Sequence, residues 1–212
     1  LFASIDQEGR SEIKLDSDLI EGNFEGSINV FTMPAVVREY FNTYYSLHDS
    51  VEQSYEAPQH FNFRLKLKKT ELLTDILVPE LENFVPGELK GQFDSKAQQL
   101  DLRFDVSEIQ YSNIGVKSFL LSTNSDSTNL NYNIFVDQIY VDSLRIDGLE
   151  FNGTVSHDSI RTNVIILDSL DLYKYIVGGT FFSIDSGFEF KLNPKEVRLN
   201  YEDWNVPDDN YI

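Results

Sequence analysis

Leu100-Asp101-Leu102-Arg103-Phe104-Asp105-Val106 opens the stretch that decides the fold of this chain, residues 100–155. Apolar and charged residues alternate strictly in this run. Successive side chains of a β-strand point to opposite faces, so a strand here has one apolar face and one charged face. Several runs of the same kind follow, each ended by a short polar turn. We therefore expect a mainly β protein with a long, largely antiparallel sheet that has one apolar side.

The composition of the 212 residues narrows the classes of partner. The chain has 17 Lys and Arg against 35 Asp and Glu, a net charge of −18. This charge repels the phosphates of nucleic acids and anionic membrane surfaces, so we expect neither as a direct partner. The sequence contains no cysteine, which excludes disulfides and thiolate metal sites. No run of residues is apolar over the roughly 18 positions that a membrane-spanning helix needs.

Two interruptions of the β pattern are predicted in the first part of the chain. Thr32 is placed to cap a helix over about residues 32–48, with Pro34 in its first turn. Apolar residues recur there every three to four positions, at Val36, Val37, Tyr40, Phe41, Tyr44 and Tyr45. This amphipathic stripe predicts packing against the rest of the protein. A second, short helix is expected over about residues 70–78, ended by Pro79.

These patterns divide the chain in two. Residues 1–86 are predicted to form a β-meander with the two inserted helices, and the segment 80–86 is expected to be irregular. Residues 87–212 are predicted to be continuous β-structure. A weak internal similarity relates residues 113–117 to residues 146–150 and hints at stacked repeating units.

Motifs of catalytic chemistry are not found. The three histidines, His48, His60 and His157, are not spaced as metal ligands. The neighbours His157-Asp158-Ser159 contain hydrolase residue types, but a catalytic triad is assembled from distant positions, so they indicate a polar turn. The acidic pairs do not follow the spacing of a calcium loop. We predict a protein that is not an enzyme, with no catalytic residues, no metal and no cofactor.

Several short motifs resemble the TamB-type proteins of the Bacteroidota, which belong to the AsmA-like superfamily. At the C-terminal end, the strand Phe190–Leu199 runs into Trp204-x-Val206-x-x-x-Asn210-x-Ile212. The strand Leu19–Gly26, followed by a helix ending in Tyr44-Tyr45, is similar to a recurring unit of that family. So is Gly91-Gln92-Phe93-Asp94, which leads into the alternating strand at Leu100.

The resemblance implies a fold and a function. Proteins of this family are long, periplasmic and anchored in the inner membrane, and their repeats form an open, taco-like β-groove with an apolar floor. They are associated with outer-membrane protein assembly and with phospholipid transport between the two membranes. The expected partners are therefore the outer-membrane protein assembly machinery, phospholipid, or both. Both ends of this chain are expected to be internal to a longer protein, whose membrane anchor would lie outside residues 1–212.

An acyl chain needs a continuous apolar surface and few polar contacts, so no catalytic residue is required. The alternative is that the apolar residues pack against one another or against the helices, because alternation reveals an apolar face but not what covers it. The candidate positions for a hydrophobic groove are Leu102, Phe104, Leu130, Tyr132, Ile134, Leu149, Phe151, Ile160, Val164, Phe188, Phe190 and Leu199.

Two further hypotheses remain open. The same fold would serve as a scaffold if an exposed strand edge paired with an outer-membrane protein. A protein of a different class, a secreted or surface β-sandwich, would bind polysaccharide through exposed tyrosines and Trp204.

Overall fold

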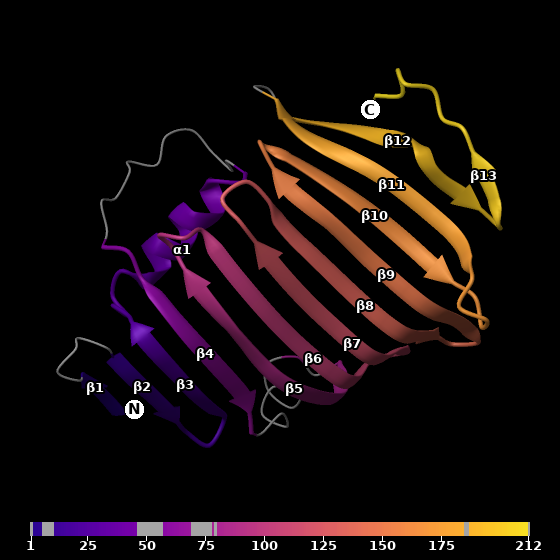
Figure 1. Ribbon diagram of the computed structural model, residues 1–212. Helices are drawn as coiled ribbons and strands as arrows, with labels where there is room; N and C mark the ends of the chain where they lie inside the picture. The colour runs from indigo at the N-terminus through magenta and orange to yellow at the C-terminus, as the bar shows by residue number, and fades with distance from the viewer. Residues whose placement is uncertain are drawn as a thin grey trace.

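The computed structural model describes residues 2–5, 11–45, 57–68, 78, 80–184 and 187–211. These residues form one open antiparallel sheet of thirteen strands and one helix (Figure 1). Every strand pairs with its neighbour in the sequence, so the order in space is the order in the chain. The sheet does not close on itself. The predicted class, mainly β with a long antiparallel sheet and an amphipathic helix, is confirmed.

The helix α1 (Met33–Asn42) lies between the third and fourth strands. The strands are β1 (Phe2–Ile5), β2 (Ser11–Asp16), β3 (Ile20–Ser27), β4 (His60–Leu67), β5 (Leu81–Asp94), β6 (Gln99–Tyr111), β7 (Ile114–Ser125), β8 (Leu130–Val141), β9 (Leu144–Ser156), β10 (Ser159–Leu167), β11 (Tyr173–Ile184), β12 (Gly187–Leu199) and β13 (Glu202–Trp204).

Short hairpin turns set the register of the long strands. The turn between β9 and β10 has φ 50° at His157 and φ 55° at Asp158. Two consecutive residues with positive φ match the right-handed twist of the flanking strands, and Asp tolerates this conformation better than most residues. Ser112 and Asp142 take the same backbone conformation in the β6–β7 and β8–β9 turns. The polar turn predicted around His157 and Asp158 is thereby confirmed.

A regular repeat of hairpins runs through the middle of the sheet. Leu100 in β6, Leu130 in β8 and Ile160 in β10 lie in one cross-strand row. In β7 the row is occupied by Ser125, which pairs with Leu130 and whose hydroxyl accepts a hydrogen bond from the Leu100 N–H. The turn residue Ser112 corresponds in the same way to Asp142, because successive hairpins here have equal length. Residues 113–117 therefore correspond to 143–147 in the fold, and the predicted alignment with 146–150 is wrong.

α1 is shorter than predicted. It ends at Asn42 and is followed by a turn that includes Tyr44, while residues 46–48 lie outside the described part of the chain. Pro34 lies in the first turn as expected. Thr32 precedes the helix, but its hydroxyl does not cap it and accepts a hydrogen bond from the Gln59 side-chain amide at 2.9 Å. Of the second predicted helix, 70–78, only Val78 is described, and it is not helical.

The prediction that residues 80–86 are irregular is wrong, because β5 begins at Leu81. The pairing of β5 with β6 shifts register on both sides of Pro86. Proline cannot donate to a β-ladder, so it is accommodated where the register slips. Residues 86 and 87, on either side of the predicted domain boundary, both lie within β5 of the continuous sheet.

The C-terminal segment covers the outer edge of β12. β13 pairs with residues 197–199 of β12, and the Val206 N–H then donates to the carbonyl of Pro194. Further on, the Asn210 side chain accepts from the Leu192 N–H at 2.7 Å and donates to the Leu192 carbonyl at 3.1 Å. Asn210 thus replaces a strand partner, and the segment shields an edge that would otherwise be open to pairing.

Candidate functional site: an apolar sheet face

Cross-strand pairing brings the apolar residues of eight strands onto one face. Residues directly opposite each other on adjacent strands lie on the same side of a sheet. The central row of this face contains Leu65, Leu89, Phe104, Leu121, Ile134, Phe151, Val164 and Val177.

Two further rows flank the central row on the same face. The row nearer α1 contains Phe63, Gly91, Leu102, Thr123, Tyr132, Gly153, Thr162 and Gly179. The row farther from α1 contains Val106, Phe119, Val136, Leu149, Ile166 and Tyr175. We call these three rows the open apolar face. They include no charged side chain.

A fourth row of this face lies at the end of the strands nearest α1, and the helix covers it (Figure 1). The core cluster is formed by Val36, Tyr40 and Tyr44 of the helix segment with Phe61, Phe93, Leu100 and Leu130 of the sheet. The aromatic stripe predicted for the helix therefore packs as expected. Phe41, on the other side of the helix, is 41% exposed.

Polar contacts fix α1 to three hairpin turns. The Tyr44 hydroxyl donates to the carbonyl of Asp126 at 2.7 Å and to that of Gln98 at 3.2 Å. The Tyr44 carbonyl accepts from the Asp158 N–H at 3.1 Å. The Tyr40 hydroxyl bonds Ser125, and burial raises the pKa of Tyr40 well above its usual value. The contacts of this helix segment therefore reach from β4 to the β9–β10 turn.

Coverage of the remaining rows is uneven: Phe63 and Leu102 pack against the core cluster, and Val106 and Val136 are buried, whereas the central row is open. No residue of the central row belongs to the core cluster, and all of its side chains keep part of their surface exposed. Val164 and Val177, toward β11, reach 36% and 37% exposure. Among the described residues, no second layer of secondary structure packs over these rows (Figure 1).

The twelve candidate residues all fall on this side of the sheet. Leu130 is buried beneath α1, and Ile160 and Phe190 share its row. Phe188, near the start of β12, is 69% exposed, and Leu199 pairs with Tyr175 at the opposite end. The remaining candidates lie in the three open rows: Leu102, Phe104, Tyr132, Ile134, Leu149, Phe151 and Val164.

Sequence reasoning missed several residues of the same surface. Phe119 and Leu121 belong to the consecutive apolar run Phe119-Leu120-Leu121, in which alternation does not show which residues share a face. Phe63 and Leu65 come from a strand whose alternation is clear, and alignment with the strand at Leu89 would have found them.

Glycines shape the open face by leaving room for rings that lie along it. A Cβ added to Gly153 would lie 2.6 Å from the Tyr132 hydroxyl oxygen, and one added to Gly91 would lie 2.9 Å from the Phe63 ring. Gly179 stands in the same relation to Phe190. Gly178, beside it, falls where the β11–β12 pairing shifts register. The aromatic side chains therefore lie flat over backbone instead of standing upright.

The opposite face combines paired charged residues with apolar ones, since Leu120, Phe135, Ile165 and Ile176 lie in a row there. Arg64 bonds Glu88 at 3.2 Å, and a cavity of about 580 Å³ lined by residues such as Asn23 and Lys90 lies on this side. Arg161 pairs with Glu196 farther along the sheet. These paired, exposed charges are typical of a solvated surface.

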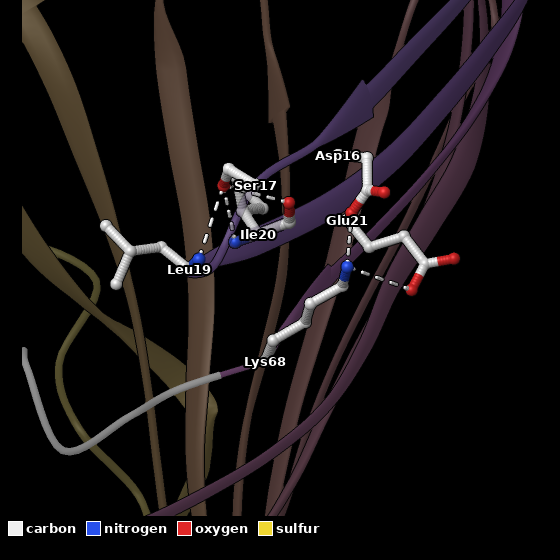
Figure 2. A network of polar contacts seen from close by, with 6 residues as sticks. All are labelled: Asp16, Ser17, Leu19, Ile20, Glu21 and Lys68. Carbon is white, nitrogen blue, oxygen red and sulfur yellow. Dashed lines mark hydrogen bonds and ion pairs between the residues drawn. The ribbon is translucent and has the colours of Figure 1, made fainter.

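A polar network secures the β2–β3 turn against β4 (Figure 2). The Ser17 hydroxyl accepts from the Ile20 N–H at 3.0 Å and donates to the Ile20 carbonyl at 3.1 Å. The Lys68 ammonium donates to Asp16 and lies 3.9 Å from Glu21. The hydrogen bond and charge of Lys68 lower the pKa of Asp16.

The described residues include no cluster of three or more His, Asp or Glu side chains able to hold a metal ion. None of their helices has the length and apolar character needed to cross a membrane. Trp204, named in the polysaccharide hypothesis, is 55% exposed on β13 at the edge of the sheet. Comparisons of the chain with protein-family models, with curated proteins and with solved structures gave no match.

Proposed function

We propose that this protein is a non-enzymatic module that binds lipid acyl chains on its open apolar face. In this proposal the chain is one segment of a longer TamB-type envelope protein, located in the periplasm, with an anchor in the inner membrane outside residues 1–212. Its cargo is phospholipid that moves between the membranes. Delivery of outer-membrane proteins to their assembly machinery is the second role that the resemblance implies.

A single observation carries the proposal: the central row of apolar side chains is continuous across eight strands, and every one of its side chains remains partly exposed. In the two flanking rows Val106, Val136, Thr162 and Gly179 are buried, and the other residues are partly exposed. From β4 to β11 such a surface extends about 34 Å, and the three rows span about 13 Å along the strands. Monomeric proteins rarely expose an apolar patch of this extent without a ligand or partner for it.

The chemistry of the face fits an acyl chain better than a ligand that needs specific polar recognition. The polar groups in the three open rows are hydroxyls, those of Thr123, Thr162, Tyr132 and Tyr175. Burying a methylene stabilises binding by about 0.8 kcal/mol, and contact with an open face buries roughly half of it. Ten methylenes would then contribute about 4 kcal/mol, which corresponds to weak binding with Kd near 1 mM per chain. Such binding allows the cargo to exchange, as transport requires.

Pairing of an outer-membrane strand with a sheet edge is less well supported. The outer edge of β12 is already occupied by residues 202–211, and the described edge strands β1 and β13 are only four and three residues long.

The proposal is tested by binding of a fluorescent fatty acid to the purified protein. Phe151→Asp places a charge in the central row and should abolish the fluorescence change, because a carboxylate there would have to be desolvated. Asn152→Asp adds the same charge one residue away, on the opposite face, and should bind like the wild type. Val164→Ser provides a milder change on the apolar face and should weaken binding.

Circular dichroism must show that each variant remains folded. Absence of binding by the wild-type protein, or equal loss of binding in Asn152→Asp and Phe151→Asp, would contradict the proposal. Binding of glycans in place of the fatty acid would favour the polysaccharide hypothesis.

A further inference from the structure

Exposed apolar side chains gather where the strands end on the side opposite α1. Three successive hairpins, β6–β7, β8–β9 and β10–β11, turn at this end of the sheet (Figure 1). Each places large side chains at its tip that are 38–74% exposed. We call this set the distal rim: Tyr111, Ile114, Leu144, Leu170, Leu172 and Tyr173.

Spacing in the sheet makes the distal rim one surface. Adjacent strands lie about 4.8 Å apart, so neighbouring hairpin tips are about 10 Å from each other and the three tips extend over roughly 20 Å. A single exposed leucine needs no explanation, but a row of them on consecutive turns does, since turns are normally polar.

A loop fixed by hydrogen bonds to Asp168 positions the most exposed leucines of the distal rim. The Asp168 carboxylate accepts from the Leu170 N–H at 2.8 Å and from the Leu172 N–H at 3.0 Å. The Tyr201 hydroxyl donates to its other oxygen at 2.6 Å. Leu170 and Leu172, 74% and 54% exposed, are therefore presented by a loop with a defined conformation.

We infer that the distal rim is a membrane-contact surface for a zwitterionic bilayer. Leucine and isoleucine at loop tips partition into the acyl region, and tyrosine favours the level of the headgroups. The net charge of −18 and acidic residues within the rim loops, such as Asp142 and Asp171, oppose binding to anionic lipids. The same carboxylates and the tyrosine rings suit the cationic headgroup of phosphatidylcholine.

This inference goes beyond acyl-chain binding on the open apolar face and stands without it. The row from Val106 to Tyr175 lies between the central row and the distal rim, and the next paired row toward the rim contains the polar residues Glu108, Lys117, Gln138 and Asp147.

The test is co-flotation of the full chain with phosphatidylcholine vesicles. The wild type should float with the vesicles, and the double variant Leu170→Ser/Leu172→Ser should show an about tenfold lower partition coefficient, since two leucines lose their insertion. The matched control is Phe31→Ser, which removes a 93% exposed apolar side chain beside α1, at the other end of the strands. It should float like the wild type.

Three results would overturn the inference: no flotation of the wild type, equal loss in Phe31→Ser, or stronger binding to phosphatidylglycerol vesicles than to phosphatidylcholine. Formation of a dimer that the double variant abolishes, without vesicle binding, would assign the rim to a second copy instead. The fatty-acid assay distinguishes the two proposals: the double variant should retain fatty-acid binding, and Phe151→Asp should retain flotation.

Discussion

At the scale of single residues, glycine and aromatic side chains are matched across strands. Tyr132 lies over Gly153, and Phe63 lies over Gly91. The sequence shows Gly-x-Phe patterns but not which ring covers which glycine, because that relation depends on the register between strands. Sequence reasoning therefore did not foresee that Gly179 makes room for Phe190.

Gly153→Ala should destabilise the protein by about 1–3 kcal/mol, because the added methyl group overlaps the Tyr132 hydroxyl and the backbone of β10 and forces both to move. Urea unfolding followed by circular dichroism measures the effect. Asn152→Ala, on the opposite face, should change stability by less than about 0.5 kcal/mol. A Gly153→Ala protein with the wild-type midpoint would show that Tyr132 does not lie over the glycine.

The pKa of Asp168 is lowered by the Tyr201 hydroxyl first and by the backbone N–H groups of Leu172 and Leu170 next. A lowered carboxyl pKa stabilises the loop above the unfolded-state value, near 4, and this stabilisation is lost as the pH falls through the lower folded-state value. Hydrogen exchange at residues 170–172 should therefore be slow at pH 6, after correction for intrinsic rates, and rise below about pH 4.

In Asp168→Ala the exchange of these amides should be fast at both pH values. Asp171→Asn, which keeps a residue that tolerates the φ of 59° at this position, should behave like the wild type. Slow exchange in Asp168→Ala would show that the carboxylate does not hold the loop.

At the scale of elements, strict alternation predicted strands correctly, and a change to helical spacing predicted α1. Both patterns follow from which faces an element buries. The errors came where local chemistry is ambiguous. Residues 80–86 were predicted to be irregular, but residues 81–86 belong to a strand, β5, whose pairing with β6 shifts register around Pro86. Thr32 was expected to cap the helix, but its hydroxyl accepts a hydrogen bond from the Gln59 side chain. No local pattern reveals such competing partners, because they come from distant parts of the chain.

Tyr44 connects α1 to two hairpin turns through one hydroxyl. Tyr44→Phe should cost about 1–3 kcal/mol, because it leaves the carbonyls of Gln98 and Asp126 without this donor at a buried site. Urea unfolding gives the magnitude. The matched control is Tyr111→Phe, at a tyrosine that is 44% exposed, for which we expect little change. Equal effects in the two variants would contradict the role of Tyr44 in fixing the helix.

At the scale of the whole molecule, the sheet is built from hairpins that contact mainly their neighbours in the sequence. The predicted idea of stacked repeating units describes this architecture, although the repeat follows the spacing from Leu100 to Leu130 and not the predicted one. The sequence also predicted the apolar face but not its coverage. Whether an apolar face is open depends on where α1 docks, and that is decided by contacts of Tyr40 and Tyr44 with turns far away in the sequence.

This architecture predicts uneven stability. Where each strand contacts only its neighbours, local opening need not involve the whole sheet, so regions braced by a second layer should open least. Amides near Leu100 and Leu130, beneath α1, should exchange on the order of tenfold more slowly than those of β11 and β12, which lie beyond the core cluster. Hydrogen exchange followed by mass spectrometry would measure the difference. Tyr44→Phe should speed exchange beneath α1 and leave exchange in β11 and β12 unchanged. If protection were uniform across the sheet and Tyr44→Phe altered it equally everywhere, the thirteen strands would open as one cooperative unit.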